Sequence, residues 1–404
     1  MPVSGAPNRT TRKLRMLSRE RLPELTESLR AAGVDGWLLY DFRGINPVVR
    51  RVLDTPGMAT RRLFAFIPTD GSEPTVVAHK IELQGLQDFP GRIIPYAAWQ
   101  ELHEALRSIV DGKRVAMEIS PNDTVPYLDR IPHGVVQLVE QLGGTVVPSN
   151  DLVTRFAARV TPAEMDDHCR AAEIIANIAR GTLGTVLHEI GTAREAGVQQ
   201  RVLNAIERAG LVTTHPPIVA FGKNAANPHY EPHEGADEVL GPDQVVLLDL
   251  WGGKSKRSVF ADQTWMGFSG HAPPEDVLEV WTTVRDARKA VVSRLETLAP
   301  GNSITGAELD DVARALIVQR GYGDAFVHRT GHSIDYDLHG IGPHLDNFET
   351  NDVRTLVPGI AFSVEPGVYL EGRFGVRSEI NVLMREDGAR PTPDVPQEEL
   401  ILQR

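Results

Sequence analysis

The segment AFSVEPGVYLEGRFGVRSEINV, residues 361–382, decides the fold of the second half of the chain. It places two acids, Glu365 and Glu379, among apolar residues, with Gly372 midway between them. Glycine is a natural turn residue, so the segment predicts a hairpin that brings the two carboxylates face to face. Burying a carboxylate is costly unless a positive charge compensates it. The segment therefore raises the question of what balances these acids.

A second acidic pair lies in VVLLDLWGGKSKRSVFADQTW, residues 245–265. Asp249 ends an apolar strand, the glycine- and serine-rich stretch after it is typical of a turn, and Asp262 lies in the returning strand. A turn centred on Ser255 and Lys256 predicts that Asp249 and Asp262 face each other, with Cβ atoms about 5 Å apart. Like charges in such positions require cations or a shared proton.

Three interpretations of these acids are open. They could be surface residues or pair with arginines such as Arg373 and Arg377. They could share protons, although the DTG-type loop of an aspartic dyad is missing. The apolar flanks and the few basic residues nearby favour metal instead, because oxygen-rich ligand sets bind divalent ions such as manganese, cobalt or zinc. Two such ions would balance four carboxylates.

The composition is that of a globular protein large enough for two or more domains, with 404 residues of which 41% are hydrophobic. A formal net charge of −12 argues against nucleic acid or an anionic membrane as the main partner. The single cysteine, Cys169, cannot form an intramolecular disulfide, and the N-terminal residues MPVSGAPNRTTRKLRML lack the apolar core of a signal peptide. We therefore expect a cytoplasmic location.

The chain divides into two predicted domains, residues 1–157 and 158–404. The first is predicted to be an α/β domain, with a helix over 21–32 and strands over 36–42, 63–68, 74–79 and 114–120. In the second, Thr161 and Glu164 form a capping box that opens a long helix to about residue 188. Further helices are predicted over 193–209, 274–298 and 305–320, between strands and turns rich in glycine and proline.

Four histidines lie in AFVHRTGHSIDYDLHGIGPH, residues 325–344: His328, His332, His339 and His344. The segment contains no HExxH motif, so a helical zinc-protease site is not supported. Order along the chain is more informative: His229 in NPHY, Asp249, Asp262, His332 in TGH, His339 in DLH, Glu365 in EPGVY and Glu379 in GVRSE. This order resembles the pita-bread metallopeptidase family, which includes prolidases, aminopeptidase P, methionine aminopeptidases and creatinase. The resemblance covers nearly the whole chain, since residues 1–157 look like the creatinase-type N-terminal domain.

The resemblance implies an α/β N-terminal domain followed by a pita-bread α+β catalytic domain that holds two metal ions. The implied ligands are Asp249, Asp262, His332, Glu365 and Glu379, with Asp262 and Glu379 bridging. His229 and His339 match substrate-binding and proton-handling histidines, and Tyr369 and Arg377 match residues flanking the metal glutamates and are implied to bind substrate. The chain departs from the family in DQTWM, in GVRSEIN, in Gly340 and in an interval between the two aspartates that is two residues longer. These departures affect substrate preference and remove no ligand.

The implied reaction is hydrolysis of the bond between an N-terminal residue and proline, as in Xaa-Pro dipeptidases or aminopeptidase P. Two divalent ions, manganese first and cobalt or zinc otherwise, can lower the pKa of a bridging water towards about 7 and supply hydroxide. His229 or His339 would stabilise the oxyanion, and Glu365 would carry a proton to the leaving nitrogen. We expect a homodimer. Two alternatives stay open: a family member recruited to lyase or amidinohydrolase chemistry, and a non-catalytic binding protein.

Overall fold

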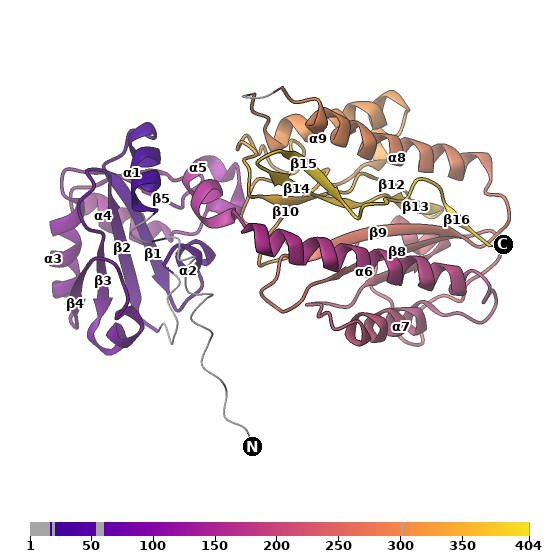
Figure 1. Ribbon diagram of the computed structural model, residues 1–404, viewed down its shortest axis with the longest axis horizontal. Helices are drawn as coiled ribbons and strands as arrows, with labels where there is room; N and C mark the ends of the chain where they lie inside the picture. The colour runs from indigo at the N-terminus through magenta and orange to yellow at the C-terminus, as the bar shows by residue number, and fades with distance from the viewer. Residues whose placement is uncertain (1–16, 18–20, 54–59, 300–301, 404) are drawn as a thin grey trace, which may run out of the picture. The chain divides into compact units, whose positions relative to one another are not determined.

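The computed structural model describes residues 17, 21–53, 60–299 and 302–403 (Figure 1). Nearly all of the N-terminal sequence that lacks an apolar core lies outside the described residues. The contacts within the chain define two compact units, residues 1–157 and 158–404. Each unit is described by itself.

The first unit is built around a six-stranded sheet of mixed direction, in the order β4-β3-β2-β1-β5-β6. Strands β1 and β2 pair antiparallel, whereas β1, β5 and β6 run parallel to one another. The strands are β1 (Gly36–Phe42), β2 (Arg62–Pro68), β3 (Thr75–His79), β4 (Arg92–Tyr96), β5 (Arg114–Met117) and β6 (Thr145–Pro148). The helices are α1 (Leu22–Ala31), α2 (Pro47–Leu53), α3 (Trp99–Val110), α4 (His133–Gln141) and α5 (Asp151–Val153), with shorter turns η2 (Lys80–Leu86), η3 (Pro121–Asp123), η4 (Pro126–Leu128) and η5 (Thr154–Ala158).

This sheet confirms the predicted α/β character of the first 157 residues. The predicted helix over 21–32 and the first three predicted strands match α1, β1, β2 and β3 to within one residue at each end. Strand β5 ends three residues earlier than predicted, because the chain turns after Met117 and the Ile119 N–H donates to its carbonyl at 2.8 Å. Apolar side chains of the sheet pack with α3 and α4 into one core.

The second unit carries three sheets. Their orders are β16-β9-β8-β7, β10-β11-β14-β15 and β12-β13. All neighbouring strands run antiparallel except β16 and β9. The strands are β7 (Ile218–Phe221), β8 (Val245–Gly252), β9 (Ala261–Phe268), β10 (Ser333–Ile334), β11 (Ala361–Val364), β12 (Gly367–Leu370), β13 (Phe374–Arg377), β14 (Ile380–Arg385), β15 (Gly388–Thr392) and β16 (Ile401–Leu402).

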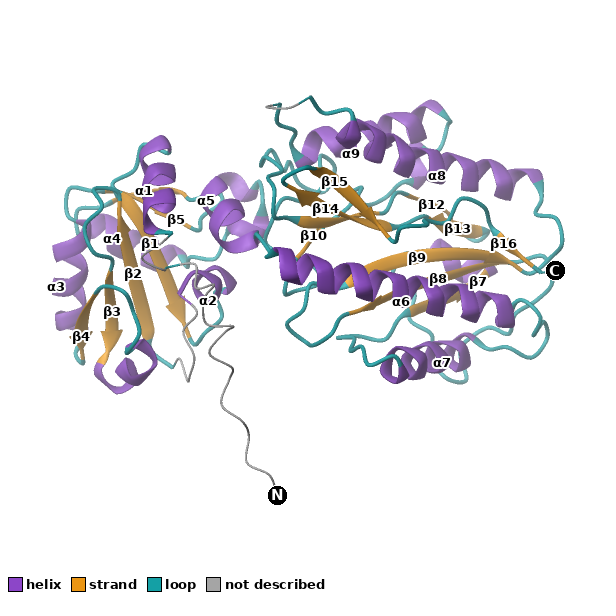
Figure 2. Ribbon diagram, viewed as in Figure 1, coloured by secondary structure: helices purple, strands orange, loops and turns teal. Residues whose placement is uncertain are grey.

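Two pairs of helices enclose these sheets (Figures 1 and 2). Helices α6 and α7 pack on β7, β8 and β9, and α8 packs on β12, β13 and β15 with α9 beside it. The predicted long helices are confirmed as α6 (Pro162–Val186), α7 (Glu195–Arg208), α8 (Glu275–Glu296) and α9 (Gly306–Gln319), with short turns η6 (Gly222–Ala226) and η7 (Gly323–Ala325). The predicted capping box opens α6, with the Glu164 N–H donating to Thr161 Oγ1 at 3.2 Å.

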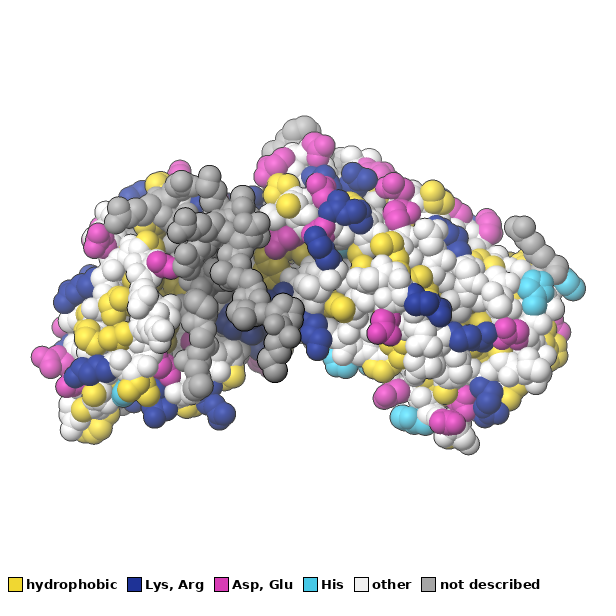
Figure 3. All heavy atoms as spheres, turned by 60° about the horizontal axis from the view of Figure 1, so that its bottom comes forward, with side chains coloured by type: hydrophobic (Ala, Val, Ile, Leu, Met, Phe, Trp, Pro, Cys, Tyr) yellow, Lys and Arg dark blue, Asp and Glu magenta, His cyan; other side chains and the backbone are white. Residues whose placement is uncertain are grey.

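Helices on both outer sides explain why β8 and β9 are buried along their whole lengths. Strands covered on both faces read as continuous apolar runs, so a charged residue within them needs a specific partner. At the surface, basic and acidic side chains are interspersed (Figure 3). Within the described part of the chain, no helix has both the length and the apolar character to cross a membrane.

The first unit contains one buried acid with a strongly shifted pKa. Glu118 follows β5 and is fully buried. It accepts hydrogen bonds from Trp37 Nε1 at 2.6 Å and Asn46 Nδ2 at 3.2 Å. Burial raises the pKa of Glu118 from 4.5 to about 7, although both hydrogen bonds oppose the shift.

The raised pKa predicts how the stability of the first unit depends on pH. Because the folded state holds the Glu118 proton more tightly, its stabilising effect is complete below about pH 4.5 and is lost as pH rises through about 7. The loss amounts to about 3 kcal/mol in the free energy of unfolding. Urea denaturation at a series of pH values should show this fall in the wild type and not in Glu118→Gln. Parallel curves for the two proteins would contradict the assignment.

Candidate metal centre

Strands β8 and β9 place Asp249 and Asp262 on one face of their sheet. The ladder pairs Asp249 with Thr264 and Trp251 with Asp262. The predicted direct pairing of Asp249 with Asp262 is therefore wrong, and the two acids are diagonal neighbours. A shift of two residues leaves every side chain on the same face, so the apolar pattern fits both registers equally well.

The turn between these strands fixes the observed register. Gly253 forms an isolated bridge with Val212, which lies beyond the end of α7. The Ser255 N–H donates to Ser258 Oγ at 2.8 Å, and the Ser258 N–H donates to the Ser255 carbonyl at 3.1 Å. These contacts involve a segment distant in sequence and side chains within the loop, neither of which alternation of residue type reveals.

The second acidic pair is arranged as predicted. Strand β11 pairs Val364 with Ile380 in β14, and β12 pairs Gly367 with Arg377 in β13. Both ladders share one register, so Glu365 and Glu379 stand opposite each other where the pairing is interrupted. Gly372 occupies the turn with φ of 72°, a left-handed conformation that favours glycine. The hairpin prediction from residues 361–382 is confirmed.

Three of the five predicted ligands converge on one point. One ligand atom from each of Asp262, His332 and Glu379 lies within 4.8 Å of the others, and all three residues are buried. His332 Nε2 also lies 3.4 Å from both Asp262 Oδ2 and Glu365 Oε1. The Nδ1 of His332 is 3.2 Å from the Ser333 carbonyl and is the nitrogen placed to donate a proton. The Nε2 of His332 therefore faces the acids.

The fourth acid, Asp249, joins the site through Arg377. The Arg377 guanidinium forms an ion pair with Asp249 and donates from Nε to Thr264 Oγ1 at 2.8 Å. Thr264 Oγ1 in turn donates to Glu379 Oε2 at 2.7 Å. Pairing with Arg377 was one of the open interpretations of these acids, and it applies to Asp249. Arg373 instead pairs with Asp276 at the surface.

Tyr369 and His328 extend this network. Arg377 Nη1 lies 3.3 Å from the Tyr369 hydroxyl, which is 2.8 Å from His328 Nε2. His328 Nδ1 lies 2.7 Å from the Arg329 carbonyl and is thus placed to donate, which leaves Nε2 to accept from Tyr369. Burial raises the pKa of Tyr369 to about 12, so its hydroxyl keeps its proton. Arg377 and Tyr369, implied to bind substrate, are buried and contact each other, and Arg377 also pairs with Asp249.

The crowding of carboxylates shifts their pKa values upward. Burial raises the pKa of Asp249 to about 7, against the opposing charge of Arg377. Burial also raises the pKa of Asp262 and, together with the charge of Asp262, raises that of Glu379 well above its usual range. The raised pKa values mean that burial of several carboxylates in one space disfavours their ionised forms.

His332 and Glu365 shift in the opposite sense. Burial lowers the pKa of His332, but its hydrogen bond to Asp262 and the charge of Glu365 outweigh that effect and raise the pKa. Burial likewise opposes ionisation of Glu365, and the charges of His332 and His328 overcome it and lower the pKa to about 2. The negative charge of this space therefore favours a cation.

The two remaining predicted histidines lie at the exposed rim of the cluster. The rings of His339 and His332 are 4.2 Å apart, edge to face. The charge of His332 lowers the pKa of His339 to about 3. His229 follows Pro228, whose carbonyl accepts a hydrogen bond from Arg377 Nη1 at 3.4 Å. Both His229 and His339 are exposed. They can therefore meet a molecule that approaches the buried acids from solvent.

The segment that carries His229 is held by a buried acid that the sequence analysis did not single out. Glu195, at the start of α7, is fully buried and accepts five hydrogen bonds. The donors are the Phe221 and Glu238 N–H groups, Asn224 Nδ2 twice and the Tyr230 hydroxyl. Glu195 thus fixes both ends of the loop around His229. No local pattern marks it, because its partners come from four separate positions.

Other site residues had a weak signal in the sequence. Thr264 lies two residues after Asp262, so strand alternation puts both on one face. His328 lies four residues before His332 in the histidine-rich segment. Asn381, two residues after Glu379, accepts the Asp262 N–H through Oδ1 at 2.8 Å. Proximity to a predicted ligand along the chain could have pointed to each residue, but the group that it contacts depends on the tertiary structure.

The donor set fits divalent metal. Asp249 Oδ1 and Asp262 Oδ1 are buried and have no hydrogen-bond partner among the described residues. Buried polar atoms normally have a hydrogen-bond partner, so these two oxygens are available to coordinate a cation. Carboxylate oxygens and imidazole nitrogen together suit manganese, cobalt or zinc.

Comparison with known proteins agrees with this geometry. The model of metallopeptidase family M24 matches residues 167–386. A probable dipeptidase PepE of Mycobacterium tuberculosis is 28% identical over 346 residues, covering 84% of this chain and 86% of the relative. The Xaa-Pro dipeptidase of Pyrococcus furiosus is 32% identical over 334 residues, covering 80% and 86%. The chain therefore belongs to metallopeptidase family M24.

Solved structures show the same fold. Dipeptidase PepE from Mycobacterium ulcerans superposes with a TM-score of 0.73 at 24% identity, covering 95% of this chain and 97% of that one. X-prolyl aminopeptidase from Caenorhabditis elegans, described as a cytosolic enzyme with a di-nuclear active site, gives a TM-score of 0.65 at 18% identity, covering 90% and 58%. The second unit thus has the pita-bread fold, which confirms the fold class implied by the order of motifs.

Removing one acid of the cluster should remove metal. Asp262→Asn keeps the shape of the side chain but loses its charge, so we expect most bound metal to be lost with the activity. Elemental analysis after dialysis against manganese measures this. Asp237→Asn, which alters a buried acid paired with Arg194, serves as the control and should keep its metal. Full occupancy in Asp262→Asn would remove Asp262 from the ligands.

Weakening the hydrogen bonds that Glu195 accepts from the segment around His229 should affect substrate binding more than metal binding. Glu195→Gln replaces one carboxylate oxygen with N–H₂, so one of the two backbone N–H groups loses its acceptor whichever way the amide lies, at a cost of about 1–3 kcal/mol. We expect a higher KM with unchanged metal content. Glu189→Gln is the matched control, since that acid pairs with Arg201 near the surface. Equal KM values for the two variants would rule out the proposed role of Glu195.

Proposed function

We propose that this chain is a metallopeptidase that uses two divalent ions to hydrolyse the bond between an N-terminal residue and proline, as an Xaa-Pro dipeptidase or aminopeptidase P. The observation that carries the proposal is the buried convergence of Asp262, His332 and Glu379 beside unpaired oxygens of Asp249 and Asp262. Curated relatives named Xaa-Pro dipeptidase support the bond preference.

Five residues would hold the ions: Asp249, Asp262, His332, Glu365 and Glu379. Manganese is the first expectation, and cobalt or zinc suit the same ligands. When bound, such ions polarise a carbonyl group and lower the pKa of water to near neutrality. The negative charges of the four carboxylates would then be balanced.

Glu365 is the candidate for proton transfer. Its side chain is 14% exposed, more than those of Asp262 and His332. Ser363 Oγ, which lies 3.0 Å from Glu365 Oε1, holds it in place. The scissile C–N bond breaks as its nitrogen gains a proton, so Glu365 would take the proton released by the attacking water and pass it to that nitrogen.

The exposed histidines would bind the substrate. His229 and His339 approach the cluster from the open side, where an imidazole N–H can donate to the carbonyl oxygen as it gains negative charge. Such a donor is worth about 3 kcal/mol in the transition state. Arg377 would act through Asp249, whose carboxylate it orients, and Tyr369 would act through Arg377. Direct contact of these two with the substrate stays a prediction.

The two units would then have separate roles. We propose residues 158–404 as the catalytic domain and residues 1–157 as the creatinase-type N-terminal domain. The cytoplasmic location and the homodimer stay predictions.

Bond preference tests the proposed function. The enzyme loaded with manganese should cleave Ala-Pro faster than Ala-Ala, by about tenfold or more in kcat/KM, because a pocket without a buried acceptor for the amide N–H discriminates against the secondary amide. Ala-Pro-Ala in parallel separates dipeptidase from aminopeptidase activity. Equal values for Ala-Pro and Ala-Ala, or hydrolysis of neither, would favour lyase or amidinohydrolase chemistry.

A further inference from the structure

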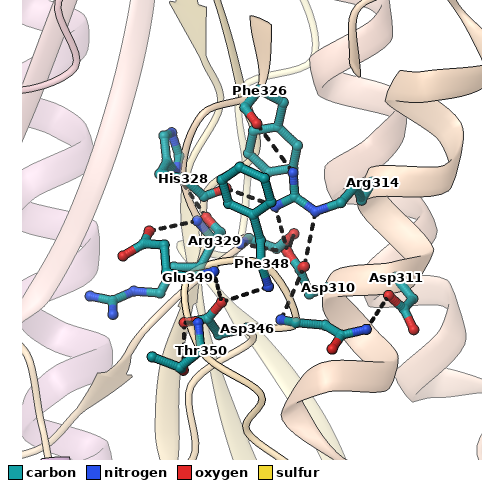
Figure 4. A network of polar contacts seen from close by, with 12 residues as sticks. Asp310, Asp311, Arg314, Phe326, His328, Arg329, Asp346, Phe348, Glu349 and Thr350 are labelled. Atoms are coloured by element: carbon teal, nitrogen blue, oxygen red, sulfur yellow. Dashed lines mark hydrogen bonds and ion pairs between the residues drawn. The ribbon is translucent and has the colours of Figure 1, made fainter. Parts of the chain in front are cut away.

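The segment that carries His328 and His332 has no regular secondary structure before β10. Backbone pairing of a β-ladder therefore cannot fix its first part. Arg314 and Asp310, one helical turn apart on α9, contact this segment instead (Figure 4). Asp310 is fully buried and Arg314 is 17% exposed at its side chain.

Arg314 binds the backbone of the segment through its planar fork. Nη1 donates to the Phe326 carbonyl at 3.1 Å, and Nη2 donates to the His328 carbonyl at 2.8 Å. The same guanidinium binds Asp310 at two points, from Nε at 3.0 Å and from Nη2 at 3.1 Å. Only an arginine presents this many donors in one rigid plane.

Two aromatic rings hold the guanidinium in place. Arg314 Cζ lies 4.2 Å from the centroid of the Phe326 ring and 4.1 Å from that of Phe348 (Figure 4). Phe348 belongs to a loop that Asp346 orders by accepting the N–H groups of Phe348, Glu349 and Thr350. The stacking restricts Arg314 to one orientation.

Asp310 continues the contact towards the metal ligands. Its Oδ1 accepts both the Thr330 N–H at 2.9 Å and the Thr330 hydroxyl at 2.6 Å. The Thr330 carbonyl then accepts the Glu365 N–H at 2.8 Å. On the far side of the segment, the His332 N–H donates to Ser363 Oγ at 2.9 Å. The segment is thus held between α9 and the end of β11.

From these contacts we infer that Arg314 and Asp310 are positioning residues for the metal centre, setting where His332 and Glu365 present their ligand atoms. Neither touches the cluster itself, and both act through the backbone at 328 and 330. The inference rests on the proposed function, because it takes His332 and Glu365 as ligands. It adds a requirement on α9 that the ligand set alone does not contain.

Substitution of Arg314 tests the inference with manganese as the probe. Arg314→Met keeps the apolar stem between the rings and removes the fork, and Arg314→Lys keeps the charge without the fork. Arg320→Met is the matched control, because Arg320 caps the same helix and pairs with Asp286 without reaching residues 326–332. All four proteins, including the wild type, are titrated with Mn²⁺ by calorimetry, and folding is checked by circular dichroism.

We expect Arg314→Met to weaken Mn²⁺ binding by about tenfold or more, Arg314→Lys to weaken it less, and Arg320→Met to match the wild type. On Ala-Pro, the Arg314 variants should lose kcat with little change in KM, because His229 and His339 are not disturbed. If Arg314→Met does not fold, Arg314→Lys against Arg320→Met decides. Equal Mn²⁺ affinity in the Arg314 and Arg320 variants would overturn the inference alone. Absence of Mn²⁺ binding by the wild type would overturn the proposed function as well.

Discussion

Mutual repulsion of buried carboxylates is the constraint on which the second unit depends. Asp249, Asp262, Glu365 and Glu379 come from two strand pairs and meet in one space that helices cover on both sides. Taking one such charge out of water costs several kcal/mol, and like neighbours add to that cost. The described residues offer one guanidinium, Arg377, in direct contact with an acid of this group. A fold that keeps this arrangement needs further positive charge, which the proposed metal ions would supply.

The residues around the acids orient the acidic side chains as well as balancing their charge. Thr264 links Arg377 to Glu379, Arg377 pairs with Asp249, and Asn381 accepts the backbone N–H of Asp262, so three of the acids have a fixed contact. Contacts of this kind around a metal site set ligand direction and are costly to change. The free oxygens of Asp249 and Asp262 are thus directed by their surroundings.

The sequence predicted the parts of the fold that short-range patterns determine. The hairpin register of residues 361–382 could be predicted because Gly372 marks the turn and the two acids are equidistant from it. The β8 and β9 hairpin was placed two residues out of register, because both registers bury the same faces and the deciding contacts involve Val212 and Ser258. Glu195 and Arg314 were missed for a related reason: the backbone groups that they bind lie 12 to 43 residues away, where only tertiary structure brings them together.

The candidate ligands differ in what holds their backbone. Asp249 and Asp262 lie within paired strands, so the ladder sets their spacing. Glu365 and Glu379 lie at the ends of paired strands, and the Glu365 N–H also donates to the Thr330 carbonyl of the irregular segment. His332 lies at the end of that segment, where Asp310 and Ser363 accept hydrogen bonds from the backbone and Arg314 donates to it. Changes in α9 should therefore reach His332 and Glu365 before they reach Asp249 and Asp262.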